Sequence, residues 1–166
     1  MNIGVVGLGI VGQAAKEGLQ TLGHDLKVHD IRFNTNIEDV LYTDLCFICV
    51  PTPSLESGAC DTSIVEGVVE ELLALKYKGI ICIKSTVMPG TTKKLQKQYN
   101  TDRICFVPEF LRERCAKEDF IENHDLCIIG TQVKEYYELI RSVHGNYPNK
   151  FVMLGETEAE LSKYFN

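Results

Sequence analysis

The chain has 166 residues, of which 45% are hydrophobic and 24% are charged, and both values are typical of a globular domain with a real core. Its 17 basic and 23 acidic residues give a formal net charge of −6. Because the chain is acidic and has no basic run, we expect neither nucleic acid nor an anionic membrane as a partner. No apolar stretch approaches the ~18 residues of a membrane span, and no secretory signal begins the chain. We therefore expect a cytoplasmic protein.

Seven cysteines raise the question of disulfides or metal. Most lie in short apolar runs of β character, where a free thiol packs as a small hydrophobic group. Cys46 and Cys49 form a CxxC pair, but positions i and i+3 of a strand point to opposite faces, so these thiols are predicted to diverge. The four histidines show no ligand spacing, and we predict no metal site.

Apolar, often β-branched runs predict strands in chain order. These runs lie at residues 2–7, 26–30, 45–50, 79–84, 103–107, 126–130 and 150–154. Helical periodicity predicts helices over 10–22, 63–76 and 133–143, and at most one brief helix after Asp30. The alternation predicts an α/β fold, a doubly wound, mostly parallel Rossmann-type sheet of about six to seven strands with helices on both faces.

Two helix starts carry the pattern of a capping box, in which a hydroxyl residue is followed three positions later by a glutamate. Ser63 with Glu66 marks the first, and Thr157 with Glu160 marks the second. After the second pair, Leu161, Tyr164 and Phe165 give the last helix an apolar face.

A glycine-rich turn joins the first predicted strand to the first predicted helix. Gly7, Gly9 and Gly12 form G-x-G-x-x-G, with Ile10 and Val11 in the first helical turn. The first glycine permits the tight turn, the second lets a pyrophosphate approach the backbone, and the third allows close packing of helix and strand. This context predicts dinucleotide binding, and the alternative is a glycine turn that only packs a helix.

An acidic residue at the end of the second strand bears on which dinucleotide binds. Asp30 lies 18 positions after Gly12, close to the ~20 expected. A carboxylate there accepts hydrogen bonds from the ribose hydroxyls and repels a 2′-phosphate, which favours NAD over NADP. Arg32 keeps NADP open as the alternative, because a nearby arginine can bind a 2′-phosphate.

Five further segments, in order, carry a resemblance to a known family. They read "FICVPTP", "DTSIVE", "KSTVMPGTT", "FVPEFLRERCAKEDFIENHDLCIIG" and "AELSKYFN". Together with the glycine loop they resemble the N-terminal half of the UDP-glucose/GDP-mannose 6-dehydrogenase family over nearly the whole chain. The resemblance implies a two-step, NAD-dependent oxidation of the C6 alcohol of a nucleotide sugar to a carboxylate. Which nucleotide sugar stays open.

The resemblance also implies how the chain is divided. Residues 1–156 correspond to the NAD-binding domain and 157–166 to the start of a truncated central helix. The family has an Asn four residues after the lysine that matches Lys163, whereas Asn166 is three after it. We expect this N-terminal half to be catalytically incomplete, because the family's nucleophilic Cys and much of its sugar pocket belong to the C-terminal half. The apolar start of the central helix predicts a weak homodimer or a frayed end.

Roles near the cofactor come from the same resemblance. It places Pro51, Thr52 and Pro53 against the cofactor, with a plain proline turn as the alternative. It places Ser85 beside the cofactor, and Thr86 near the nicotinamide, where its hydroxyl can hold a water. Hydroxyls at a strand end also cap helices, and this remains the alternative for both.

Three charged residues match catalytic positions of the family. Glu109 would position or deprotonate the water that hydrolyses a thioester, and Glu113 would help to hold the substrate. If their segment is helical, these two carboxylates share one face. Lys163 would stabilise the oxyanion at C6. The alternative readings are a solvated acidic face and an exposed lysine.

Departures from the family pattern concern the substrate side. Val107 replaces an Asn, Arg114 a Gly, and His124 with Leu126 a Pro and an Arg, and Cys115 stands where Ser or Thr is usual. Two other functions therefore remain open. One is a non-catalytic NAD-binding or assembly module, and the other is a β-hydroxyacid dehydrogenase-type NAD domain, against which "PEFLRE" and "AELSKY" speak.

Overall fold

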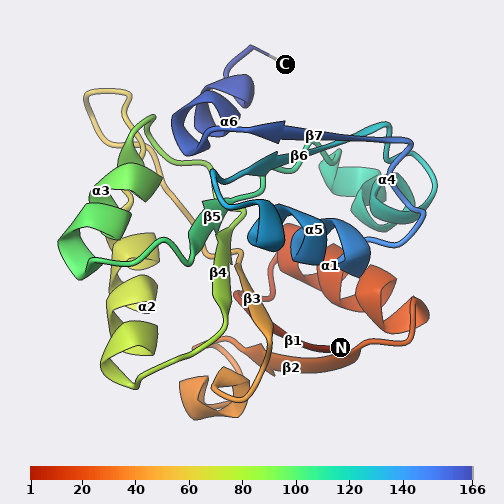
Figure 1. Ribbon diagram of the computed structural model, residues 1–166, viewed down its shortest axis with the longest axis horizontal. Helices are drawn as coiled ribbons and strands as arrows, with labels where there is room; N and C mark the ends of the chain where they lie inside the picture. The colour runs from red at the N-terminus through yellow and green to blue at the C-terminus, as the bar shows by residue number, and fades with distance from the viewer. Residues whose placement is uncertain (166) are drawn as a thin grey trace.

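The computed structural model describes residues 1–165, and one seven-stranded sheet in the order β2-β1-β3-β4-β5-β6-β7 runs through it (Figure 1). Neighbouring strands are parallel except for the antiparallel pair β5 and β6, so the predicted mostly parallel Rossmann-type sheet is confirmed. The strand order reverses between β1 and β3, which makes this the topological switch point where ligands bind in such sheets. The strands are β1 Asn2–Val6, β2 Asp25–His29, β3 Leu45–Ile48, β4 Ile80–Ile83, β5 Ile104–Phe106, β6 Leu126–Gly130 and β7 Lys150–Leu154.

Helices cover both faces of the sheet, as predicted. On one face α1, α4 and α5 pack against the strands, and on the other α2, α3 and α6 do so (Figure 1). Within residues 1–165, none of the helices has the length and apolar character needed to cross a bilayer. The α-helices are α1 Ile10–Thr21, α2 Ser63–Ala74, α3 Thr91–Tyr99, α4 Ala116–Ile121, α5 Lys134–Val143 and α6 Glu156–Ser162, and two 3-10 helices are η1 Ile37–Val40 and η2 Glu113–Cys115.

The strands are buried on both sides, which explains why their sequences are continuously apolar rather than alternating. In β3, Leu45 and Phe47 pack towards α1, whereas Cys46 and Ile48 pack towards α2. Cys49 packs on the α1 side, so the two thiols of the CxxC pair lie on opposite faces and are free. The prediction that they diverge is confirmed.

The second predicted capping box is wrong, and the residue involved caps a different helix. Helix α6 begins one residue before Thr157, and Gly155 is its N-cap. Glu160 is fully buried and accepts hydrogen bonds from the backbone N–H groups of Gly90 (2.6 Å) and Thr92 (2.8 Å). These two amides belong to the start of α3, whose own sequence supplies no side-chain cap. The prediction about Asn166 lies outside the described residues.

The first predicted capping box is misplaced by one residue. Thr62, not Ser63, is the N-cap of α2, and its hydroxyl donates to the Glu66 carboxylate (3.2 Å). The Ser63 N–H group donates to Asp61 Oδ1 (3.0 Å). An aspartate two residues upstream therefore satisfies a free amide of the first turn, which is the ordinary role of a capping side chain.

Replacement of Glu160 by Ala should lower the free energy of unfolding by about 1–3 kcal/mol, since two amides at the start of α3 lose their acceptor. Glu158 is exposed on the same helix, so Glu158→Ala is the matched control and should change stability far less. Urea denaturation followed by circular dichroism measures both. Equal effects of the two substitutions would contradict the capping role of Glu160.

Two imidazoles, those of His124 and His144, pack among the rings of Phe47, Phe120 and Phe151 on the α1 side of the sheet. His144 is fully buried, donates through Nδ1 to the carbonyl of Ile140 (2.8 Å), and its Nε2 has no partner among the described residues. The ring of the partly buried His124 lies 6.0 Å away, centroid to centroid. Burial, aided by the positive charge of Lys84, lowers the pKa of His144 to about 3 and that of His124 to about 4. Both rings are therefore neutral at pH 7.

These lowered pKa values predict that the fold loses stability in mild acid. An unfolded histidine titrates near pH 6.5, so between about pH 6.5 and 4 the unfolded chain binds more protons than the folded chain, and the free energy of unfolding falls as pH falls. Replacing His144 with Phe keeps a ring there and should flatten this slope, as measured by denaturation at several pH values. His24→Gln, at a partly exposed ring, is the control. An unchanged slope in His144→Phe would contradict the assignment.

Candidate functional site

A cleft of about 730 Å³ opens at the carboxyl ends of the strands that flank the switch point. It collects the glycine loop, the end of β2 and the turns after β3, β4 and β5. Of the predicted site residues, Gly12, Pro53 and Lys163 do not line it. Those that do are Gly7, Gly9, Ile10, Val11, Asp30, Pro51, Thr52, Ser85, Thr86, Glu109 and Glu113. Most of the predicted site is therefore brought to one place.

The three glycines of the loop are required for different reasons. A Cβ on Gly7, whose φ is +96°, would lie 2.6 Å from the Cys49 carbonyl oxygen, and one on Gly12 would lie 1.8 Å from the Gly7 carbonyl oxygen. A Cβ on Gly9 would meet nothing within 4 Å. The packing of the chain itself thus explains Gly7 and Gly12. Of the three, only Gly9 borders open space, where a ligand can approach the backbone.

The start of α1 fits a bound anion. Gly9 is the N-cap, no side chain caps this end, and the first turn holds no acidic residue. The Gln13 side chain instead donates back to the Leu8 carbonyl (2.8 Å) and fixes the loop. Uncapped amides at the positive end of a helix dipole favour a phosphate group, so these residues fit the pyrophosphate of a dinucleotide.

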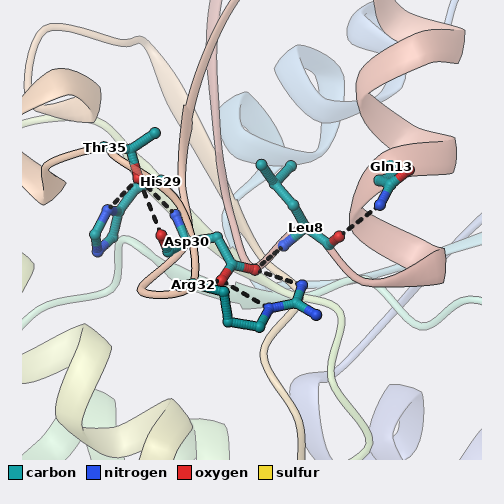
Figure 2. A network of polar contacts seen from close by, with 6 residues as sticks. All are labelled: Leu8, Gln13, His29, Asp30, Arg32 and Thr35. Carbon is teal, nitrogen blue, oxygen red and sulfur yellow. Dashed lines mark hydrogen bonds and ion pairs between the residues drawn. The ribbon is translucent and has the colours of Figure 1, made fainter.

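Asp30 lies beside this loop with both carboxylate oxygens engaged (Figure 2). Oδ2 accepts from the Leu8 N–H group (2.7 Å) and from Arg32 Nη2 (2.9 Å). Oδ1 accepts from the backbone N–H group (2.9 Å) and Nε (3.0 Å) of Arg32. The side-chain hydrogen bonds of Arg32 are the main cause that holds the pKa of Asp30 well below its usual range, with the backbone contacts adding to it. Asp30 is therefore charged at neutral pH.

Thr35 closes the short loop after β2, and sequence reasoning missed it. Its hydroxyl accepts from the Asp30 N–H group (3.0 Å) and lies 3.1 Å from the Asp30 carbonyl oxygen and 3.0 Å from His29 Nδ1 (Figure 2). His29 lines the cleft as well. A lone threonine in a polar loop carries no motif, so only the folded loop reveals that it positions Asp30.

The two hydroxyl residues after β4 differ in their contacts. Ser85 donates to the carbonyl of Val50 (2.6 Å) and so ties the end of β4 to the turn after β3. The Thr86 hydroxyl has no hydrogen-bond partner within residues 1–165 and borders the cleft. Thr86 is therefore free to meet a ligand or water, whereas Ser85 holds the backbone together. Pro53 lies outside the lining, and its carbonyl accepts from the Asp61 N–H group (2.8 Å).

Glu109 and Lys163, which are 54 positions apart, meet in the fold. Lys163 Nζ lies 3.0 Å from Glu109 Oε1 and also donates to the Glu109 carbonyl oxygen. Glu109 Oε2 accepts from the Leu111 N–H group (2.8 Å). The segment before η2 is not helical, so the helical condition for a shared face is not met, although Glu113 borders the same cleft.

A second cavity of about 400 Å³ adjoins the first, and Lys84, Glu109 and Leu111 line both. Lys84 is only 3% exposed. Its Nζ lies 3.4 Å from the Val107 carbonyl oxygen and 5.2 Å from the centroid of the Phe47 ring. No carboxylate of residues 1–165 forms an ion pair with it. The sequence signal was a lysine that ends an apolar strand, and our reading of the sequence gave it no role.

Residues 26–147 match the model of the UDP-glucose/GDP-mannose dehydrogenase family, NAD binding domain. The chain belongs to this family. It is 27% identical to the UDP-glucose 6-dehydrogenase of Haloferax volcanii, with 100% of this chain and 50% of that protein covered, and 31% identical to that of Pseudomonas aeruginosa, with 89% and 36% covered. The UDP-glucose dehydrogenase structure from Pyrobaculum islandicum superposes with a TM-score of 0.87 at 26% identity, over 99% of this chain and 48% of that one.

The chain thus spans half or less of the length of these relatives. The family match and the fold together make it an NAD-binding domain of an oxidoreductase family, as the sequence predicted. The uncapped helix end, the open space at Gly9 and the carboxylate of Asp30 are the features of the cleft that suit this cofactor.

Because Gly9 and Gly12 have different surroundings, their substitution by alanine should have different consequences. Gly9→Ala should leave the melting temperature nearly unchanged but weaken NADH binding at least about tenfold, because a methyl group would fill the approach of the pyrophosphate. Gly12→Ala should lower both stability and binding, because its Cβ collides with the Gly7 carbonyl. Thermal unfolding and calorimetric titration measure the two quantities.

The control is Gly67→Ala, at an exposed position inside α2 where a Cβ meets nothing within 4 Å. It should raise the free energy of unfolding by about 0.5–1 kcal/mol and leave NADH binding unchanged. Normal NADH affinity in Gly9→Ala would show that the cofactor does not approach the loop there.

Proposed function

We propose that the chain is the cofactor-binding part of a nucleotide-sugar 6-dehydrogenase of the UDP-glucose 6-dehydrogenase kind. The observation that carries the proposal is the adjacency of two cavities: the dinucleotide cleft shares Glu109 and Lys84 with a smaller chamber. A sugar C6 alcohol in the smaller chamber would lie beside a nicotinamide in the cleft. NAD, when bound, supplies the hydride acceptor. The names of the two relatives support this choice over a β-hydroxyacid dehydrogenase.

The charged pair at the junction gives this chain a part in the chemistry. Lys163 places an ammonium group beside Glu109, where it would stabilise negative charge that develops on the C6 oxygen. Glu109, held by the Leu111 amide, would accept a proton from a water that attacks C6 in the final hydrolysis. The free Thr86 hydroxyl would help to hold that water. Glu113, at the exposed rim, would contact the substrate.

The second oxidation in this proposal needs a thiol that this chain does not offer at the site. Among the described residues, Cys49 is the only cysteine that lines a cavity, and it lines the larger cleft. Burial raises the pKa of its thiol to about 12, and a thiol is a poor nucleophile when it stays protonated. Cys115 lies against the Asp119 carboxylate (3.8 Å) and outside both cavities. A covalent intermediate would therefore depend on a thiol outside residues 1–165.

Substrate grip is the other part that this chain leaves open. Holding C6 within a few ångströms of the nicotinamide accounts for much of the rate in such a reaction, and this chain spans half or less of its relatives. We infer that residues 1–156 act as the cofactor domain and that the segment from residue 157 on, which holds most of α6, leads into a sugar-binding part. Leu161, Tyr164 and Phe165 are exposed there, which supports pairing with a further domain or a weak homodimer.

Alone, the chain should bind NADH but give no steady NADH production with UDP-glucose, UDP-N-acetyl sugars or GDP-mannose. Mixed with the C-terminal half of a relative, it should show turnover that Glu109→Gln lowers by at least about tenfold. Glu118→Gln, at an exposed residue of α4 outside both cavities, is the matched control. Absorbance at the NADH band follows the reaction.

Each contrary outcome has a separate meaning. Steady production of two NADH per sugar by the chain alone would refute the need for an outside thiol. Tight NADH binding without turnover in any mixture would favour the non-catalytic module. Absence of NADH binding would remove the assignment of the cleft.

A further inference from the structure

The Asp30 carboxylate, which a ribose must reach, is already occupied by Arg32. Four donors reach its two oxygens, two on each (Figure 2). An ionised carboxylate offers about four lone-pair sites, so no site is left for a ribose hydroxyl. A dinucleotide can bind Asp30 only if some of these contacts are given up.

The four contacts divide into two that can be lost and two that hold the carboxylate in place. The backbone N–H groups of Leu8 and Arg32 contact one oxygen each, and they belong to the folded loops. The Arg32 side chain adds one further contact to each oxygen, through Nε and Nη2. That side chain is 60% exposed, whereas Asp30 is 7% exposed. Rotation of Arg32 into solvent would free one site on each oxygen, which matches the two hydroxyls of a ribose diol.

We propose that Arg32 is a displaceable latch on Asp30: it competes with the ribose diol of NAD, and it becomes a ligand for a 2′-phosphate when the charge at position 30 is removed. The inference rests on the NAD cleft and deepens the proposed function by naming what sets cofactor choice. The matched fork of guanidinium and carboxylate makes the latch specific to arginine. Its exposure to water keeps it weak enough for a ribose to displace.

The same pair explains how one cleft discriminates between the two dinucleotides. With Asp30 charged, the guanidinium is neutralised and the carboxylate repels a 2′-phosphate. Without that charge, the guanidinium stands at the edge of the ribose site with no acid beside it. Arginine is the side chain best suited to bind a phosphate there. The preference for NAD is therefore a property of the pair, and neither residue sets it alone.

The test is calorimetric titration of NADH and NADPH into four forms of the full chain: the natural protein, Arg32→Ala, Asp30→Asn and the double variant. Arg32→Ala should bind NADH roughly three- to tenfold more tightly, because no latch has to be displaced. Asp30→Asn should bind NADPH at least about tenfold more tightly than the natural protein, and the double variant should lose that gain.

Two further variants serve as controls. Lys27→Ala removes a positive charge from β2, the strand that precedes Asp30 and Arg32, at an exposed pair with Asp25 outside the cleft, and should leave both affinities unchanged. Arg32→Gln keeps a polar side chain without the charge and the two-pronged contact of the guanidinium, and it should behave as Arg32→Ala. Thermal unfolding of each variant shows whether it is folded before titration.

Unchanged or weaker NADH binding in Arg32→Ala would overturn the latch, and so would a double variant that binds NADPH as tightly as Asp30→Asn. If none of the folded forms binds either cofactor, the latch and the cleft assignment fall together. Failure to oxidise any nucleotide sugar in the mixture with a relative's C-terminal half would instead remove the proposed function alone, because these titrations contain no sugar.

Discussion

The close approach of α1 to the turn after β1 is the constraint on which the site depends. Position 12 lies against the Gly7 carbonyl oxygen, and only glycine fits there, because a Cβ would be 1.8 Å from that oxygen. That approach aims the helix start at the switch point and leaves Gly9 facing open space. It also brings the Leu8 amide to Asp30 at 2.7 Å, so the turn after β1 and the end of β2 form one unit. The geometry of the cofactor cleft thus depends first on how the backbone packs at these glycines.

The sheet could be predicted from sequence because strands that are buried on both faces give short, continuous apolar runs, and seven such runs occur along the chain. The helices were less readable where their ends depend on distant residues. Helix α3 was missed because its sequence is polar apart from Leu95 and Tyr99, and its cap comes from Glu160. The local pattern at Thr157 and Glu160 pointed to a helix start, but a tertiary contact took the glutamate for another helix. Such contacts override local capping signals.

The glycine loop and Asp30 could be found from spacing alone, because their roles follow from backbone geometry at fixed offsets. The pairing of Glu109 with Lys163 was different, since no local pattern joins residues that far apart and only the family resemblance placed them in one site. Lys84 and Thr35 were missed for the same physical reason: a single lysine or threonine becomes informative only when the fold shows what surrounds it.

The contact of Glu160 with α3 has a consequence for the order in which the chain folds. The carboxylate lies 70 and 68 positions after the two amides that it caps. During synthesis, the start of α3 therefore leaves the ribosome long before its partner exists, and at ~5–20 residues per second the delay is several seconds. Until then α3 is a short polar helix without a cap, which is marginal by itself in water. The β4–α3–β5 crossover should consequently become rigid late, when α6 docks beside it.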